Sequence, residues 1–185
     1  RQFYISNSRY DLLKLNTSSY VLILCGLYLP IGFYFVFRFL TLTKVGLDYL
    51  NILLMLGSFF TFIFSILLIH TYNLKKLIMY IASAQFGILL ILISLTLYSA
   101  AVFHFFTSII SLVILCLSFG IISSKLNNEQ DIRKMGNLII KCPSMFLFIL
   151  IGFISLLGIP YFSGFYSNQL IFFQFSLINE NSYFL

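Results

Sequence analysis

Long apolar runs recur along this chain, and one short polar segment, residues 125–136, separates the last two of them. Most runs approach the roughly 20 residues that an α-helix needs to cross the hydrocarbon core of a bilayer. They are too long for the strands of a transmembrane barrel, which also alternate in polarity. Because the mean hydropathy is +1.03 and only 9% of the residues are charged, a soluble domain of this size would lack the polar residues to cover its surface. The sequence therefore predicts an all-α integral membrane protein.

Five segments are predicted to cross the membrane. They are residues 19–37, 50–69, 77–97, 100–122 and 144–177. The last segment is too long for one straight crossing, and it contains Gly158, Pro160 and Gly164 near its middle. Proline removes a backbone donor and clashes with the preceding turn, while glycine permits backbone angles that other residues resist. This pattern predicts that the fifth crossing is a discontinuous helix.

A helix break inside a membrane has two interpretations. Freed carbonyl and amide groups are costly in lipid unless protein or water covers them, so discontinuous helices often gather at the substrate and ion sites of transporters. A packed kink without any transport role is the alternative. Gly158, Pro160 and Gly164 are therefore candidate site residues under the first interpretation and packing residues under the second.

Basic residues divide unevenly between the predicted loops. Five crossings place most of the lysines and arginines on one side: Arg1, Arg9, Lys14, Lys75, Lys76, Lys125, Arg133, Lys134 and Lys141. The other side has only Arg38 and Lys44. Because loops rich in Lys and Arg stay on the side from which the protein inserts, this asymmetry supports five crossings. It also predicts that residues 123–143 form a polar loop facing the matrix or cytoplasm.

The net charge of +6 follows from this loop asymmetry, and no groove of aromatic and basic residues for nucleic acid accompanies it. No glycine-rich phosphate loop, Rossmann fingerprint or Ser/His/Asp set appears. The cysteines, Cys25, Cys116 and Cys142, are too scattered for a metal site, and we interpret them as small packing residues. We therefore expect no catalytic residue, no metal, no flavin, iron-sulfur or nicotinamide cofactor, and no nucleic-acid partner.

Two motifs, in the right order and at the right distance, carry a family resemblance. Residues 126–136 (LNNEQDIRKMG) and 158–167 (GIPYFSGFYS) resemble the core of NADH dehydrogenase subunit 5, an antiporter-like membrane subunit of respiratory complex I. Residues 73–76 and 83–87 resemble two further motifs of that family. The resemblance extends over about residues 51–177.

The resemblance implies a place in a larger assembly. Subunits of this family combine two inverted repeats with a long lateral helix, and this chain resembles only the later part, as a fragment or one piece of a split subunit. We therefore expect residues 1–185 to form a single membrane domain that is part of an antiporter-like inverted-repeat fold. The implied partners are the remaining part of subunit 5, other membrane-arm subunits of complex I and membrane lipid.

The implied function is that of a core membrane subunit in the mitochondrial inner membrane. Such a subunit has no redox centre, and it contributes to proton pumping by an enzyme that couples NADH oxidation to ubiquinone reduction. A free-standing cation/proton antiporter component, whose family resembles subunit 5 in fold, is the alternative. The retained motif of the polar loop favours complex I.

The family assigns proton translocation to a midplane chain of lysine, histidine and glutamate residues, and this sequence departs from that chain. His104 matches the first of two family histidines, but Ser108 and Leu112 stand where the second histidine and a lysine are expected. Asn168 replaces a lysine after the helix break. The proton-path candidates are the polar residues of this region, His104, Thr107, Ser108 and Asn168. The losses predict a degenerate path, while a working half-channel and a packing role for His104 are the alternatives.

The charged residues of the polar loop also have two interpretations. They are Glu129, Asp131, Arg133 and Lys134. One interpretation is a solvated, self-paired surface, which is the common outcome for mixed charges. The other is a docking site for a neighbouring subunit. Neither interpretation is catalytic.

Overall fold

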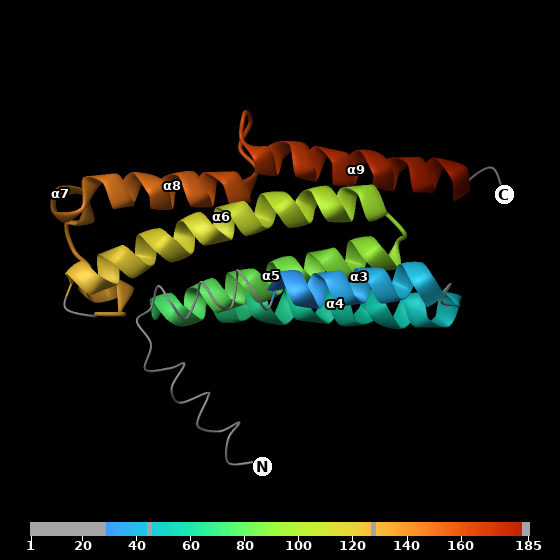
Figure 1. Cartoon of the computed structure of the whole chain (residues 1–185), viewed down its shortest axis with the longest axis horizontal. Helices are drawn as coiled ribbons and strands as arrows, with labels where there is room; N and C mark the ends of the chain where they lie inside the picture. Colours follow the sequence, from blue (N-terminus) through green and yellow to red (C-terminus); the bar gives the residue numbers. More distant parts are fainter. Residues whose placement is uncertain (1–28, 44–45, 127–128, 183–185) are drawn as a thin grey trace, which may run out of the picture.

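The computed structural model describes residues 29–43, 46–126 and 129–182, and the regular elements in these ranges are helices. The helices, labelled as in Figure 1, are α3 (Leu29–Thr43), α4 (Leu47–Ile69), α5 (Leu74–Ser94), α6 (Tyr98–Lys125), the 3₁₀ helix η2 (Ile132–Lys134), α7 (Leu138–Lys141), α8 (Pro143–Leu157) and α9 (Ser163–Ser182). One isolated antiparallel bridge joins Asn73 to Asp131. The all-α architecture predicted from the apolar runs is confirmed for the described part of the chain.

Three of the described helices are long and apolar enough to cross a membrane: Asp48–Ile69, Leu74–Ser94 and Tyr98–Lys125. They correspond to the second, third and fourth predicted crossings. Two shorter apolar helices, Pro30–Leu40 and Pro143–Leu157, overlap the first and fifth. Residues 19–28 of the first predicted crossing lie outside the described residues. Its predicted end at residue 37 is wrong, because α3 continues to Thr43 with the exposed Arg38 inside it.

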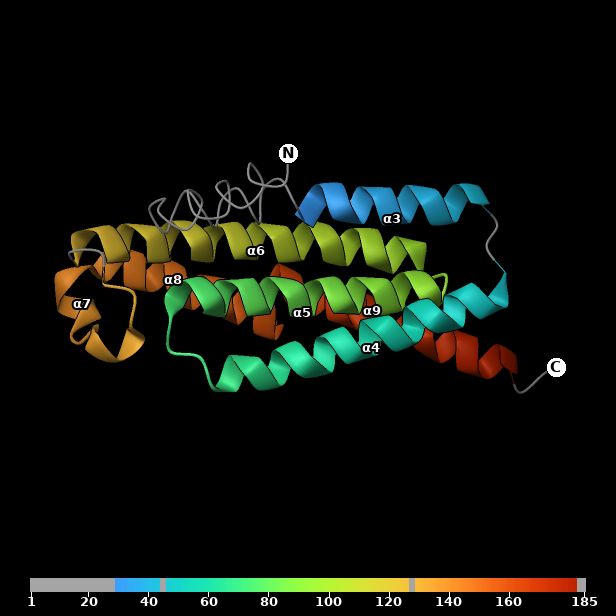
Figure 2. The same cartoon turned by 90° about the horizontal axis from the view of Figure 1, so that it is seen from below.

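Helix α6 lies at the centre of the molecule. On one side it packs against α8 and α9, which follow each other end to end along its length (Figure 1). On the other side it packs against α5, which in turn contacts α3 and α4. Figure 2 shows α4 running alongside α5. The bridge between Asn73 and Asp131 brings the α4–α5 turn and the polar loop after α6 to the same end of the bundle.

Two hydrophobic clusters hold these helices together. One joins α5, α6 and α8 through buried side chains that include Ile78, Leu115 and Ile149. The other joins α3, α5 and α6, and in it the Phe33 ring stacks on the Phe105 ring with 4.1 Å between centroids. Because lipid is as apolar as these side chains, close packing rather than exclusion of water stabilises the contacts between membrane helices.

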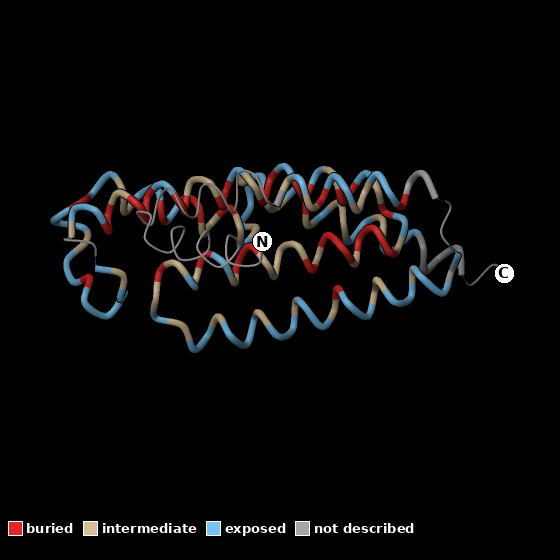
Figure 3. The backbone as a smooth tube through the Cα atoms, turned by 60° about the horizontal axis from the view of Figure 1, so that its bottom comes forward, coloured by how far each residue is buried: buried red, intermediate tan, exposed pale blue. Residues whose placement is uncertain are grey.

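Two glycines allow α4 and α5 to approach each other closely. A Cβ atom on Gly57 would lie 2.9 Å from the Gly87 carbonyl oxygen, and a Cβ atom on Gly87 would lie 2.7 Å from Cγ2 of Thr61. Small residues are common at helix contacts in membranes for this reason. Most of the remaining α4 surface is exposed (Figure 3), so this helix presents a broad apolar face to its surroundings.

Local sequence explains several helix ends. The Asn73 side chain accepts a hydrogen bond from the Lys75 backbone N–H at 3.0 Å and so caps the start of α5. Pro143 occupies the first turn of α8, where a backbone N–H has no partner within the helix. Helix α8 ends at Gly158, whose φ of 73° lies in the left-handed region that glycine adopts readily.

Candidate functional site

His104 links three helices in the interior of the bundle. It lies on α6, and only 7% of its surface is exposed. Its Nε2 atom is 3.0 Å from Oε1 of Gln85 on α5, and its Nδ1 atom is 3.4 Å from Oγ of Ser167 on α9. The imidazole therefore has a hydrogen-bond partner at each ring nitrogen, as a buried polar group requires.

Both partners of His104 can accept a hydrogen bond. The Ser167 hydroxyl donates to the Gly164 carbonyl oxygen at 2.9 Å, which leaves its lone pairs for Nδ1. Gln85 presents Oε1 to Nε2. An imidazolium has two N–H donors, whereas a neutral imidazole has one donor and one acceptor. The arrangement satisfies an imidazolium as it stands, and rotation of the Ser167 hydroxyl supplies the donor that a neutral ring needs at Nδ1.

Hydroxyl side chains continue the polar face of α6 beyond His104. Thr107, Ser108 and Ser111 follow at helical spacing, which places them on the same side of the helix as the histidine. Each hydroxyl donates to a backbone carbonyl oxygen about one turn earlier, at 2.9 to 3.1 Å. Their protons are thus satisfied within the helix, and their lone pairs can accept bonds from water or from neighbouring helices.

This face borders a small polar cavity between α5, α6, α8 and α9. Its volume is about 10 Å³, which is near the minimum that holds one water molecule. The lining residues are Gln85, His104, Thr107, Ser108, Ser111, Ser155, Leu156, Gly164, Ser167 and Asn168. The four residues proposed from the sequence as proton-path candidates, which come from α6 and α9, therefore lie around one cavity.

Sequence reasoning alone misses Gln85, Ser155 and Ser167 as members of this cluster. Two of them carry a signal, since Ser155 lies three residues before Gly158 and Ser167 lies three residues after Gly164. Each serine is thus within about one helical turn of the break. Gln85 lies in residues 83–87, which resemble a family motif, but its contact with His104 depends on how α5 packs against α6.

The connection between α8 and α9 depends on two glycines. A Cβ atom on Gly158 would lie 2.6 Å from Nδ2 of Asn168, and a Cβ atom on Gly164 would collide with the Ser155 carbonyl oxygen. Glycine at both positions lets the end of α8 and the start of α9 lie against each other beside α6. Of the three predicted helix-break residues, Gly164 borders the cavity, whereas Gly158 and Pro160 do not, and Pro160 lies in the exposed connection.

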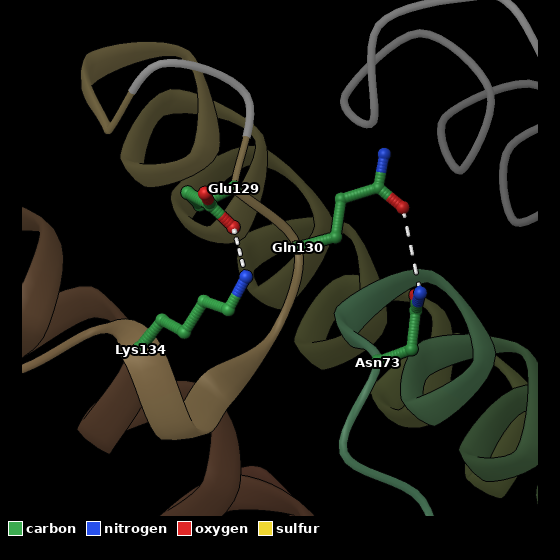
Figure 4. Close-up of polar contacts among 4 residues, drawn as sticks. All are labelled: Asn73, Glu129, Gln130 and Lys134. Atoms are coloured by element: carbon green, nitrogen blue, oxygen red, sulfur yellow. Dashed lines mark hydrogen bonds and ion pairs between the residues drawn. The ribbon is translucent and has the colours of Figure 1, made fainter.

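The polar loop folds back on the α4–α5 turn of its own chain. The Leu74 N–H donates to the Gln130 carbonyl oxygen at 3.0 Å. The Ile132 N–H donates to the Tyr72 carbonyl oxygen, also at 3.0 Å. The Asn73 side-chain amide donates to Oε1 of Gln130 at 3.5 Å (Figure 4). These bonds hold the loop across the end of the bundle.

The four charged residues of the loop have different surroundings. Glu129 and Lys134 form an exposed ion pair with 3.6 Å between Oε2 and Nζ (Figure 4). The Arg133 guanidinium carbon lies 3.2 Å from the centroid of the Tyr72 ring, in a cation–π contact. Asp131 contributes its backbone to the bridge with the α4–α5 turn. These contacts join the loop residues to one another and to the α4–α5 turn.

The described residues place no group of three or more His, Cys, Asp or Glu side chains where they could hold a metal ion. Cys116 and Cys142 are buried in the packing between helices. The polar cluster around His104 is therefore the strongest candidate site. Its residues can hold hydrogen bonds, a water molecule and the proton of one imidazole.

Comparison with known proteins finds a family model described as NADH:quinone oxidoreductase/Mrp antiporter, transmembrane, which matches residues 15–185. NADH-ubiquinone oxidoreductase chain 5 of Dictyostelium citrinum is 34% identical over 140 residues, which are 76% of this chain and 21% of the relative. Chain 5 of Patiria pectinifera is 39% identical over 118 residues, or 64% of this chain and 18% of the relative. Chain 5 of Rattus norvegicus is 30% identical over 152 residues, which are 82% of this chain and 25% of the relative. The chain thus spans about a fifth to a quarter of the length of these relatives.

Proposed function

The chain belongs to the NADH:quinone oxidoreductase/Mrp antiporter transmembrane family, and from this membership we propose that it serves as a membrane segment of chain 5 type in an NADH:ubiquinone oxidoreductase. The observation that carries the proposal is the similarity, at 30 to 39% identity, to proteins named NADH-ubiquinone oxidoreductase chain 5. The enzyme would couple NADH oxidation to ubiquinone reduction and proton movement in the mitochondrial inner membrane. This chain would act there with other membrane subunits of the complex.

The proposed role is a non-redox one. The scattered cysteines and the absence of a glycine-rich dinucleotide motif in the sequence support a chain without flavin, iron-sulfur cluster or nicotinamide. Electron transfer would then take place in other subunits. The contribution of this chain would be helices that complete the membrane arm.

The proposed topology has five crossings. Helices α4, α5 and α6 have the length and composition of full crossings. Helices α8 and α9 lie end to end along α6 (Figure 1), which supports one discontinuous crossing made of both. Helix α3, together with the residues before it, would supply the remaining crossing. The basic residues near the α4–α5 turn and the polar loop support a matrix location for that end.

The proton path through this chain is proposed to be degenerate. Apart from His104, the residues that line the cavity are neutral at physiological pH. A proton station has to alternate between charged and uncharged states, which serine, threonine and asparagine side chains do not do. Leu112 and Asn168, where the family resemblance leads us to expect lysines, are an apolar core residue and an amide. The segment would therefore act mainly as a scaffold.

The competing function is a free-standing cation/proton antiporter component, because the family model also covers Mrp antiporters. To decide between the two, a tagged chain would be purified from its native membranes in mild detergent and resolved on a native gel. We expect it to migrate with NADH dehydrogenase activity and with other subunits of that enzyme. A tagged inner-membrane protein of similar size from another complex is the control for non-specific association.

Two results together would contradict the proposal. The first is recovery of the tagged chain as a monodisperse homo-oligomer without NADH dehydrogenase subunits. The second is exchange of sodium for protons by that oligomer after reconstitution into liposomes. They would support the antiporter function instead.

A further inference from the structure

The connection between α8 and α9, residues 158–162, stands out from the bundle. Figure 1 shows it as a narrow loop on the side of the α8–α9 row that faces away from α6. We call this segment the elbow. Within it 92% of the Tyr161 surface is exposed, and the nearby residues Leu157 and Ile159 are exposed by 72% and 44%.

The elbow lies near the middle of the bundle rather than at an end. Ser155 and Gly164, which flank it, share a cavity with His104 and Ser111 of α6. Ser111 lies at the centre of α6, a helix of 28 residues with the length and composition of a membrane crossing, and His104 lies two turns closer to its start. If α6 crosses the bilayer, the elbow therefore lies within the hydrocarbon core.

Several backbone groups of the elbow have no hydrogen-bond partner within the part of the chain that the structure describes. Within it, the Phe162 N–H donates to the Ile159 carbonyl oxygen at 3.2 Å. Pro160 has no N–H to donate. Among the described residues, neither the Tyr161 N–H nor the carbonyl oxygens of Pro160 and Tyr161 have a hydrogen-bond partner. Tyr161 also has a φ of 75°, which is uncommon for a residue with a side chain.

Lipid cannot cover such a segment, because it offers no hydrogen-bond donors and irregular backbone does not face the hydrocarbon region. A water-filled space is also a poor match, since the segment that carries the unpaired carbonyls exposes the large hydrophobic side chains of Leu157, Ile159 and Tyr161. A protein surface that combines apolar side chains with a few hydrogen-bond donors can cover both the apolar side chains and the unpaired carbonyl oxygens of the elbow. Hydroxyl, amide and indole side chains supply such donors between membrane helices.

We propose that the elbow is a contact site for another membrane protein, whose transmembrane segment packs on Leu157, Ile159 and Tyr161 and donates hydrogen bonds to the carbonyl oxygens of Pro160 and Tyr161. The inference rests on the proposed crossing by α8 and α9. It assigns to the elbow a role separate from that of the cavity, which Gly164 and Ser167 at the start of α9 border.

The test places a nitroxide spin label at Tyr161→Cys, in the assembled membrane complex, with the native cysteines of the chain replaced by serine or alanine. Collisions with oxygen report exposure to lipid, and collisions with a water-soluble nickel chelate report exposure to water. We expect the label to be protected from both reagents. A photoreactive phenylalanine analogue at position 161, which keeps an aromatic side chain, should cross-link to another membrane polypeptide of the same purified complex.

Labels at Phe148 on α8 and Phe172 on α9 serve as controls for membrane depth, and we expect both to be protected from nickel. High oxygen accessibility at position 161 would overturn the proposal in favour of a lipid-covered elbow. High nickel accessibility there alone would overturn it in favour of a water-filled space, and a cross-link only to a second copy of this chain would also overturn it. If nickel also reached Phe148 and Phe172, the crossing by α8 and α9 would fail together with the proposal.

Discussion

His104 shows how one buried residue can have both a structural and a functional interpretation. Its contacts with Gln85 and Ser167 connect α5, α6 and α9, which is enough to explain its presence in a packed interior. The same contacts accommodate a protonated ring. The functional interpretation needs further titratable residues that continue a proton path from His104. The other side chains that line the cavity beside His104 are neutral.

Replacement of His104 by glutamine tests whether the residue carries protons. Glutamine retains a donor and an acceptor for Gln85 and Ser167 but does not titrate, so we expect an unchanged number of protons moved per NADH and at most a modest loss of assembled complex. The measurement is proton uptake against NADH oxidation in sealed membranes. His70→Gln, at the exposed end of α4, is the matched control. A clear fall in the ratio, with normal complex abundance and normal NADH oxidation, would show a live path through His104.

Gly164→Ala tests the close contact between α8 and α9. The added methyl group collides with the Ser155 carbonyl oxygen, which belongs to backbone and cannot simply rotate away. We expect a loss of stability of about 1–3 kcal/mol, the usual cost of overpacking. It should be visible as a lower melting temperature of the detergent-solubilised complex. Gly136→Ala, where the methyl group meets nothing within 4 Å, is the control. Equal melting temperatures for Gly164→Ala and Gly136→Ala would contradict the close contact of Gly164 with the Ser155 carbonyl oxygen.

At the scale of helices, the sequence predicts α4, α5 and α6 well because each is a continuous apolar run of about bilayer length. Their ends are less predictable. Helix α6 continues to Lys125, past the predicted end at residue 122, and within this extra turn the Ser124 hydroxyl donates to the Ile121 carbonyl oxygen at 2.8 Å. The candidate site around His104 is likewise only partly predictable from the sequence. The polar face of α6 can be read from its spacing, but Gln85 reaches His104 only through the packing of two helices.

The contact between α4 and α5 provides the prediction at this scale. Gly87→Ala places a methyl group 2.7 Å from Cγ2 of Thr61 and 3.0 Å from the Gly57 carbonyl oxygen, so the helices have to separate. We expect less assembled complex and a lower melting temperature, by an overpacking cost of about 1–3 kcal/mol. Thr61→Ser removes the nearest carbon and should restore part of the loss in the double variant. Gly46→Ala, at an open position, is the control. If the double variant melts no higher than Gly87→Ala, the strain lies in the contact with the Gly57 carbonyl oxygen rather than in the contact with the Thr61 methyl group.

At the scale of the whole molecule, polar and charged groups gather at one end of the helical bundle. The loop residues Gln130 and Ile132 bond to the α4–α5 turn, and Arg133 covers Tyr72 at the same end. Lys76 and Lys134 are exposed there. Because charged groups are costly in hydrocarbon, the proposed topology places this end outside the bilayer core, and the proposed crossing by α4 places the opposite end of that helix beyond the other surface.

This arrangement predicts which positions react from each side of the membrane. In a chain without native cysteines, single cysteines at Lys76 and Lys134 should react with an impermeant reagent from the same side, the matrix side if the basic residues set the orientation. A cysteine at Gly46, which precedes the crossing by α4, should react only from the opposite side. The measurement compares labelling of intact and of inverted membrane vesicles, and Ile78→Cys, buried in the core, is the unreactive control. Reaction of the Lys134 and Gly46 positions from one side would mean that α4, α5 and α6 do not make three successive crossings, because an odd number of crossings between these positions requires that they face opposite compartments.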